Sequence, residues 1–230
     1  MVERRKLLAW LGLAALGTAA ADEPLESADW SVTRDRARQE AGPLRRAGTA
    51  VRRDGKRLSI TSRSGKVVNF DSVHPGPEAE SQYTDYRYAG ALLGGRFHRV
   101  NVIYYEGDSI FLVSAQSGVV TEIYEEPRLS PDRRYLFVAS PSEAYNTSGI
   151  FLWEISAQGE LIERLRFEPT EYALFNFRRW EDKRSISLNR IGSYAGHCTP
   201  DKTWQQAMVL QREGDSWVLH PRGAGVCKAG

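Results

Sequence analysis

The sequence has few of the residues that most often carry catalytic or metal chemistry. Its 230 residues include only two cysteines, four histidines and two methionines. The histidines are scattered, and no second ligand pair at metal-like spacing accompanies the adjacent His197 and Cys198, so no metal site is expected. The G-x-S-x-G elbow that would expose a nucleophilic serine is missing. The glycines of residues 90–95 precede neither a Lys-Ser/Thr pair nor a helix, so neither a phosphate loop nor a cofactor is expected.

Long hydrophobic runs are missing too. The apolar stretch at residues 7–19 has 13 residues, whereas about 18 or more are needed to span a bilayer. It follows a basic start and ends in the run of three alanines at 19–21, an order typical of a secretory signal peptide rather than of a membrane anchor. We therefore expect residues 1–21 to be a signal peptide, no transmembrane segment after cleavage, and a periplasmic or secreted protein. The paired arginines partly match a twin-arginine signal, but Glu3 stands where Ser or Thr is usual, which favours general secretion.

An excess of charge of one sign is absent from the chain as a whole. It has 31 basic and 29 acidic residues, and the expected signal peptide holds three and one of them, which leaves 28 of each. Residues 34–66 depart from this balance, with eleven Lys/Arg against three acidic residues. Such a segment either forms a solvated face, the default interpretation, or binds an anionic partner. Nucleic acid is not expected, because no aromatic residues interleave the basic run. The candidate binding residues here are Arg45, Arg46, Arg52 and Arg53.

The two cysteines, Cys198 and Cys227, form an even count, as expected for an exported chain. A bridge between them would close a loop of about 30 residues and stabilise the fold by roughly 3–4 kcal/mol on the chain-entropy model. The alternative is that Cys198 is a metal ligand, but the sequence offers no further ligands at suitable spacing. We predict a disulfide.

Residues 22–49 form a polar and basic lead-in. The stretch "SVTRDRARQEAGP" offers Ser31 or Thr33 as an N-cap, helix-forming residues, and a stop at Gly42-Pro43. It predicts a short, weakly held helix, because its apolar face of Val32, Ala37 and Ala41 is thin. Residues 50–230 have a different character: short apolar runs alternate with Gly, Pro, Asp and Ser, as β-strands and turns do.

An internal repeat organises this β region. "IFLVSAQSGVVTEI" begins at Ile110, and "IFLWEISAQGELIERL" begins forty residues later. Weaker relatives begin at Arg57 and Ala207, and the turn glycines of the four hairpins are Gly65, Gly118, Gly159 and Gly214. A further strand pair precedes three of the hairpins, at 86–105, 128–140 and 174–190. Four short strands per unit are typical of propeller blades. The predicted fold is all-β, a propeller-like array of about three to four antiparallel β-meander units with a short N-terminal helix. An open stack, or a partial ring completed by residues 22–56, is the alternative to a closed ring.

The repeat resembles a known kind of blade. "SPDRRYLFVAS" followed by "GIFLWEISAQGE" is similar to the SPDG-type blades of TolB-like and WD40-like propellers, and residues 83–190 resemble a group of uncharacterised exported bacterial proteins. The resemblance implies that Ser130-Pro131-Asp132 opens a hairpin turn, and proline and serine are suited to that place. The chain has Arg133 where such repeats usually carry glycine. The likeness implies a fold and says almost nothing of function.

A long segment near the C-terminus is the other candidate binding site. Residues 191–206 exceed the length of a hairpin turn, and binding residues concentrate on long loops held by a rigid scaffold. The alternative is that the segment only completes the last sheet. Its candidate residues are Tyr194, His197, Asp201, Lys202 and Trp204.

Two hypotheses of function follow. The favoured one is an exported, non-catalytic binding protein of the cell envelope, whose partner is a protein or an anionic envelope component. The alternative is a hydrolase of sugars or peptides with carboxylates that converge in a concave pocket, which no linear motif would reveal. The paired carboxylates at 125–126 and 181–182 read as solvated loop charges, and no catalytic residue is predicted.

Overall fold

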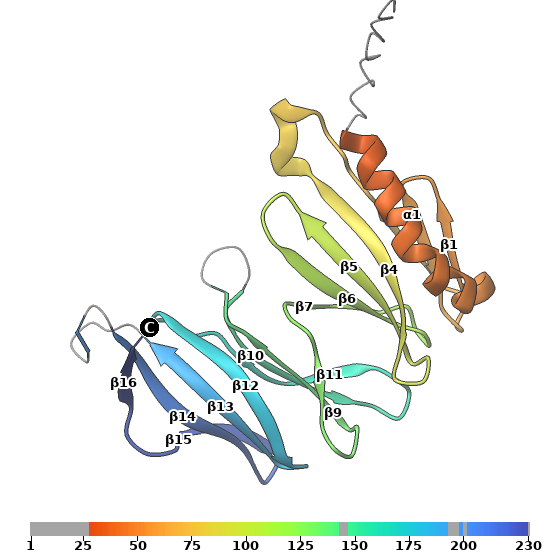
Figure 1. The fold of residues 1–230 in the computed structure, drawn as a ribbon. Helices are drawn as coiled ribbons and strands as arrows, with labels where there is room; N and C mark the ends of the chain where they lie inside the picture. The colour runs from red at the N-terminus through yellow and green to blue at the C-terminus, as the bar shows by residue number, and fades with distance from the viewer. Residues whose placement is uncertain (1–27, 143–146, 193–197, 200–201, 230) are drawn as a thin grey trace, which may run out of the picture.

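Four antiparallel β-sheets follow one another along the chain and make up most of the structure (Figure 1). The computed structural model describes residues 28–142, 147–192, 198–199 and 202–229. The predicted signal peptide lies outside the described residues and stays a prediction, as does the boundary between the lead-in and the β region. No helix within the described ranges has the length and apolar character needed to cross a membrane.

Each sheet is built mainly from strands that pair in sequence order, as predicted. The first sheet contains β1 (Val51–Asp54), β2 (Arg57–Thr61) and β3 (Val67–Asp71). The second contains β4 (Thr84–Leu92), β5 (Phe97–Tyr104), β6 (Asp108–Ser114) and β7 (Val120–Ile123). The third contains β8 (Arg128–Leu129), β9 (Tyr135–Ser140), β10 (Gly149–Ile155) and β11 (Leu161–Phe167). The fourth contains β12 (Ala173–Asp182), β13 (Ser185–Gly192), β14 (Lys202–Glu213) and β15 (Ser216–Pro221), with β16 (Val226–Ala229) paired to β14.

The turn glycines of the repeat confirm the predicted hairpins. The φ angles of the four residues are all positive, between 59° and 85°, a region that glycine adopts without steric cost. They lie in the turns β2–β3, β6–β7, β10–β11 and β14–β15. The four residues are Gly65, Gly118, Gly159 and Gly214.

Three hydrophobic clusters join the sheets face to face. In β9, Tyr135 and Phe137 pack toward the fourth sheet, whereas Leu136 and Val138 pack toward the second. Successive side chains of a strand point to opposite faces, so a strand covered on both faces needs an unbroken apolar run. The first sheet has one buried face only, and its strand β2 alternates between buried and less buried residues. Position in the stack therefore explains why the strands of the repeat differ in pattern.

The helix α1 (Ala28–Ala47) is longer than predicted and buries a different face. It runs through Gly42 and Pro43, and the glycine that follows its end is Gly48, with a φ of 60°. Its last turn continues past the proline because Leu44 and Ala47 pack against the cluster between the first two sheets. Ala37 and Ala41, expected to face the core, are exposed. The predicted stop was wrong, and so was the predicted apolar face at Ala37 and Ala41, while the side chain of Val32 lies outside the described residues.

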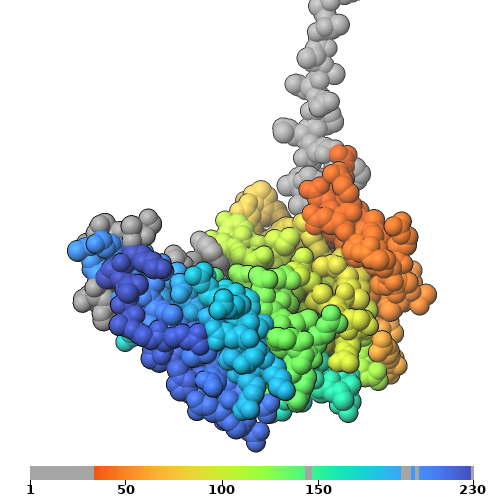
Figure 2. All heavy atoms as spheres, turned by 60° about the horizontal axis from the view of Figure 1, so that its bottom comes forward, coloured from red at the N-terminus to blue at the C-terminus, as the bar shows by residue number. Residues whose placement is uncertain are grey.

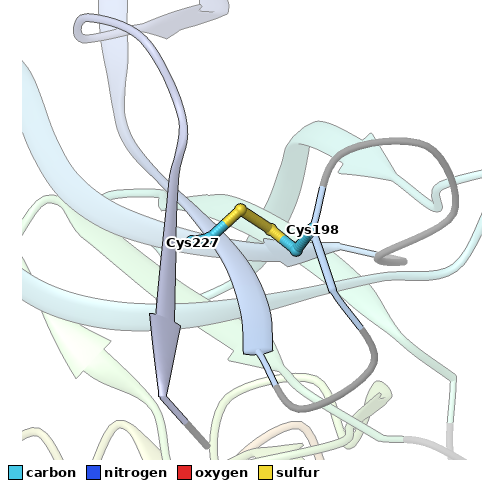
Figure 3. The surroundings of a disulfide bond; sticks show 2 residues. All are labelled: Cys198 and Cys227. Carbon is cyan, nitrogen blue, oxygen red and sulfur yellow. A yellow bond between two sulfur atoms is a disulfide. The ribbon is translucent and has the colours of Figure 1, made fainter.

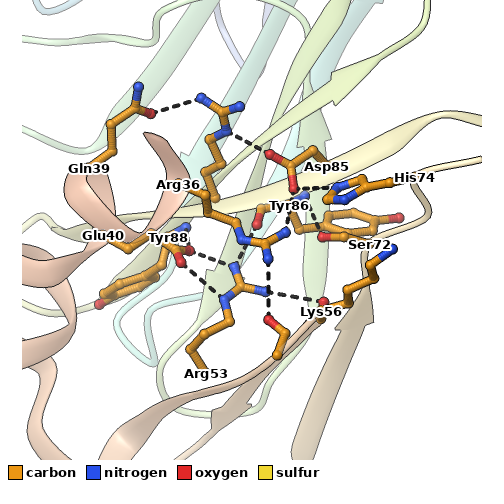
Figure 4. A network of polar contacts seen from close by, with 12 residues as sticks. Arg36, Gln39, Glu40, Arg53, Lys56, Ser72, His74, Asp85, Tyr86 and Tyr88 are labelled. Atoms are coloured by element: carbon orange, nitrogen blue, oxygen red, sulfur yellow. Dashed lines mark hydrogen bonds and ion pairs between the residues drawn. The ribbon is translucent and has the colours of Figure 1, made fainter. Parts of the chain in front are cut away.

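Buried charges hold this helix instead (Figure 4). Asp85 on β4 is fully buried, and its Oδ1 accepts a hydrogen bond from Arg36 Nη1 at 2.8 Å and lies 3.0 Å from His74 Nε2. Its Oδ2 accepts a hydrogen bond from Arg87 Nε at 2.7 Å. Burial acts to raise the pKa of Asp85, but the hydrogen bonds from Arg87, Arg36 and His74 outweigh it, so the pKa is lowered.

A second buried carboxylate, that of Glu40, lies on α1 one helical turn after Arg36. Glu40 Oε2 accepts a hydrogen bond from Arg53 Nε at 3.0 Å, and its Oε1 accepts one from the backbone N–H of Tyr88 at 2.6 Å. Arg53 also donates to the Tyr86 carbonyl at 2.6 Å. Arg36 and Glu40 thus fasten α1 to both the first and the second sheet. Together with Asp85 and Arg53 they form what we call the helix-anchoring network.

The four sheets form an open arc. The first and last sheets lie at opposite ends of the molecule in two views that differ by 60° (Figures 1 and 2). Of the arrangements predicted from the sequence, the open stack describes the chain.

Candidate functional site

The Ser-Pro-Asp sequence forms a turn, as predicted, and its serine is used in folding. Ser130 is 2% exposed; its hydroxyl donates to Asp132 Oδ1 at 2.6 Å and accepts the backbone N–H of Tyr135 at 2.9 Å. Partial burial opposes the charge on Asp132, but the hydrogen bonds from Ser130 and from the Arg134 backbone lower its pKa. A buried hydroxyl committed to two such bonds is a structural element of the hairpin.

Turns of all four sheets meet at one end of the molecule, the lower end in Figure 1, which Figure 2 brings toward the viewer. In an up-and-down meander of four strands, the first and third turns lie at the same end of the sheet. The second, third and fourth sheets contribute these turns, and the three-stranded first sheet contributes its β2–β3 turn. Backbone hydrogen bonds join the turns of the first two sheets: Arg63 N–H donates to the Ala115 carbonyl at 2.8 Å, and Ser64 N–H donates to the Gln116 carbonyl at 3.0 Å. We call this surface the turn rim, made of residues 62–66, 93–96, 115–119, 131–134, 156–160, 183–184 and 212–215.

Three connected grooves cross the turn rim. The first, of about 340 Å³, is lined by Arg63 and Arg96 from the first two sheets and by the β10–β11 turn of the third. The second, of about 350 Å³, shares Arg96 with it and adds Arg133 and Arg134. The third, of about 330 Å³, shares Arg134 with the second and contains three cations of the fourth sheet: Lys183, Arg184 and Arg212. Because neighbouring grooves share lining residues, they form one track from the first sheet to the fourth.

The acidic residues beside this track are already engaged. Glu154 receives hydrogen bonds from Arg134 at 2.9 Å and Arg164 at 2.9 Å, and these two bonds lower its pKa despite some burial. Asp132 is engaged in its own turn. Arg96, Arg133 and Lys183 form no ion pair with any residue that the structure describes. The track therefore presents unneutralised positive charge.

The candidate residues near the C-terminus are placed only in part. Tyr194, His197 and Asp201 lie outside the described residues. Lys202 is exposed on β14, while the Trp204 ring fills space beside Gly192 and Gly225 and lies 5.5 Å from the Arg190 guanidinium. A Cβ on Gly225 would come within 2.3 Å of that ring. The indole of Trp204 is therefore used in packing at this end of the sheet.

The predicted disulfide is present and lies in the same region (Figure 3). Cys198 and Cys227 are bonded, with a Cα–Cα distance of 5.7 Å, and the bridge joins the segment before β14 to β16. Among the described residues, no group of three or more His, Cys, Asp or Glu side chains is placed to hold a metal ion.

The four arginines proposed from the basic segment lie in different surroundings. Arg45, Arg46 and Arg52 are exposed, whereas Arg53 belongs to the helix-anchoring network. Sequence reasoning missed Arg96, Arg133 and Lys183 as site residues. The signal that identifies them is a basic residue in the first turn of the second, third and fourth meander units, as in "LGGR", "SPDRR" and "EDKR".

A separate cleft of about 260 Å³ on the second sheet contains carboxylates. It is lined by Asp108, Glu125 and Glu126 together with Arg99 and Arg87. Arg99 Nη1 donates to both oxygens of Glu126, at 2.9 and 2.7 Å, so one of these carboxylates is neutralised by a neighbour.

Comparisons with known proteins give a limited result. No protein-family model matches the chain, and no curated protein matches it. Among solved structures, a "putative 6-phosphogluconolactonase" from Bacteroides fragilis is 14% identical, with a TM-score of 0.34 over 77% of this chain and 54% of that one. A protein from Lactobacillus plantarum is 16% identical, with a TM-score of 0.25 over 73% of this chain and 63% of that one. The chain thus spans 54% and 63% of the length of these structures, and likenesses at this level support no statement about activity.

Proposed function

We propose that this chain is an exported, non-catalytic binding protein of the cell envelope, built from TolB-like blades, and that it holds an anionic partner at the turn rim. One observation carries the proposal: a continuous track of grooves is lined by Arg96, Arg133 and Lys183, and these three have no ion pair among the described residues. Concave surfaces lined by charge of one sign concentrate the field and attract ligands of opposite charge. Stability does not account for such cations, because none of them neutralises a described carboxylate.

The sequence candidates take secondary places in this proposal. Arg45 and Arg46 lie in the last turn of α1, and Arg52 is exposed on β1, so these three extend the positive charge of the first sheet. Lys202, on β14 beside the disulfide, marks the competing candidate place in the 191–206 segment. The two places are tested separately below.

Removing three cations from the turn rim is expected to weaken binding to native envelope material about a hundredfold, from the usual contribution of each cation near an anionic surface. The variant combines Arg96→Gln, Arg133→Gln and Lys183→Gln. Its affinity is measured by co-sedimentation of the purified protein with envelope fragments over a series of salt concentrations. Because exposed charges are screened by salt, wild-type affinity should fall steeply as salt rises, and the variant should show a shallower dependence.

A matched variant removes the same charge from other surfaces. It combines Arg38→Gln on the exposed side of α1 with Lys202→Gln and Lys228→Gln beside the disulfide. We expect it to bind as wild type does. Loss of binding in this variant and not in the first would move the site to the 191–206 segment, and equal loss in both would mean that only net charge matters.

The hydrolase alternative keeps one place, the carboxylate-lined cleft of the second sheet. Under that hypothesis, wild-type protein cleaves members of a mixed glycan and peptide library, and Glu125→Gln abolishes cleavage. Under the binding proposal, neither protein changes the library. Mass spectrometry of the library before and after incubation distinguishes the two.

A further inference from the structure

We infer that the occupant of the turn rim is a linear polyanion without bases, lying along all three grooves, and that Arg133 is a specificity-determining residue for it. This inference rests on the proposed function and adds the class of ligand. The unpaired cations come from different sheets: Arg96 from the second, Arg133 from the third and Lys183 from the fourth. A small anion requires donors that converge on one point, whereas cations distributed along a track match a chain with repeated charges.

The lining of the track disfavours nucleic acid as that chain. Single-stranded nucleic acids gain much of their affinity from bases that stack on aromatic side chains. The aromatic residue that lines the grooves is Tyr135, which is 3% exposed. The Arg134 and Arg212 guanidinium groups each lie 5.9 Å from its ring. The ring is thus covered, so the polymer that fits is one with repeated phosphate, sulfate or carboxylate groups alone.

The backbone of the second groove supplies an independent observation. Within the described residues, only Leu93 and Arg133 have a positive φ without being glycine, at 54° and 57°, and both line this groove. The left-handed region is costly for residues with a Cβ. Leu93 recovers this cost by packing against the cluster between the second and third sheets. Arg133 is exposed and has no ion pair with a described residue. No such contact of its side chain therefore offsets the cost of its backbone conformation.

A glycine at position 133 would remove the strain, because glycine adopts positive φ angles without steric cost. Contact of its guanidinium with the polyanion accounts for an arginine at this strained position. Stability and binding should therefore change in opposite directions when the residue is replaced. This separates a ligand contact from a structural arginine, whose loss would lower both.

The test uses inorganic polyphosphate, because its chain length changes while its chemistry does not. Binding of the purified protein to fluorescent long-chain polyphosphate is competed with orthophosphate, tripolyphosphate or unlabelled long chains at equal total phosphate. Simultaneous contacts raise affinity by about 10²–10⁴ over single ones, so long chains should compete at least a hundredfold better for each phosphate group. Equal competition by orthophosphate would overturn the inference about the polymer and leave anion binding at the rim intact.

Three substitutions at position 133 complete the test. Arg133→Gly is expected to keep or raise Tm by roughly 2 °C and to weaken polyphosphate binding about fivefold to tenfold. Arg133→Gln should weaken binding equally without the gain in Tm, and Arg133→Lys should retain most of the affinity. A lowered Tm with unchanged affinity for Arg133→Gly would overturn the role of Arg133.

Failure of the proposed function has a different signature. If the triple variant of Arg96, Arg133 and Lys183 binds long-chain polyphosphate as wild type does, the turn rim is not the site. If phosphatidylglycerol vesicles bind in a rim-dependent manner and long-chain polyphosphate does not, the occupant is a lipid surface, and the linear polymer is excluded.

Discussion

Replacing Asp85 by asparagine is expected to lower the free energy of unfolding by about 3–5 kcal/mol, the usual effect of breaking a buried ion pair from one side. Asp85 is fully buried, and Arg36 beside it is 4% exposed. Without the carboxylate, the buried guanidinium of Arg36 loses its countercharge. The asparagine amide also replaces one of the two acceptor oxygens by an NH2 group, so either Arg87 at Oδ2 or Arg36 and His74 at Oδ1 lose their acceptor. Chemical denaturation followed by circular dichroism measures the change, and α1 should become the first segment to exchange its amide hydrogens.

The Asp85 carboxylate also makes the free energy of unfolding depend on pH in the acidic range. Its pKa in the folded protein is lowered relative to the unfolded chain, so its contribution is fully present above the unfolded pKa of about 3.9. That contribution is lost as pH falls through the lower folded value, since protonation removes the charge that Arg87 and Arg36 require. The wild-type protein should lose stability steeply below about pH 4, and Asp85→Asn should show a shallower slope there.

A matched substitution separates burial from pairing. Asp71→Asn removes a carboxylate that also pairs with an arginine, Arg57, at 2.7 Å, but both partners are more than half exposed. Exposed pairs contribute little because water solvates both charges and salt screens them. Asp71→Asn should therefore shift the denaturation midpoint far less than Asp85→Asn. Similar shifts for the two variants would show that α1 is held by apolar contacts and that the buried network is dispensable.

The sheets could be predicted from the sequence because the hairpins of the repeat share one sequence pattern. An apolar run, a turn glycine and a second run recur, and the glycines that were predicted to turn, such as Gly118 and Gly159, have positive φ. The alternation of side chains along a strand is a local property, and a one-residue shift would turn every core residue outward. The strands and their pairing could thus be predicted without knowledge of the packing between sheets.

The helix was misread because its anchors are charged. Sequence patterns identify a buried helix face by its apolar residues, and Ala37 and Ala41 were the obvious choice. The face that packs contains Arg36 and Glu40, whose partners on β4 and β1 are 13 to 49 positions away in the chain. A charge count over residues 34–66 cannot tell which arginines are neutralised inside the fold and which remain exposed. Arg53 was therefore grouped with Arg52, although only Arg52 is exposed.

The turn rim was missed for a related reason. Its unpaired cations are separated by tens of residues, and all three lie outside the basic segment 34–66 that the charge count singles out. Only the common direction of the meanders brings Arg96, Arg133 and Lys183 to one end of the molecule. The position of a cation within its repeat unit therefore predicts whether it lies at the rim, whereas its position in the linear charge profile does not.

Removing the disulfide by Cys198→Ser with Cys227→Ser is expected to lower the free energy of unfolding by about 3–4 kcal/mol, because the unfolded chain regains the freedom of a 29-residue separation. Tm should fall by roughly 10 °C. The effect in the folded state is local, since the bridge fixes β16, whose residues pair with Lys202–Gln205 at the start of β14. Differential scanning calorimetry measures the shift. Wild-type protein in reductant should match the variant, and the variant should not respond to reductant.

The bridge variant also distinguishes the two candidate binding places. Gln205 is paired with β16 near one end of β14, whereas Arg212 at the other end of the strand lines the turn rim. Binding at the rim should therefore survive loss of the bridge at temperatures where the variant is folded. If envelope binding disappears with the bridge but persists after Arg96, Arg133 and Lys183 are replaced, the 191–206 segment is the site. A wild-type Tm that does not move when both thiols are free by mass spectrometry would instead contradict the stabilising role of the disulfide.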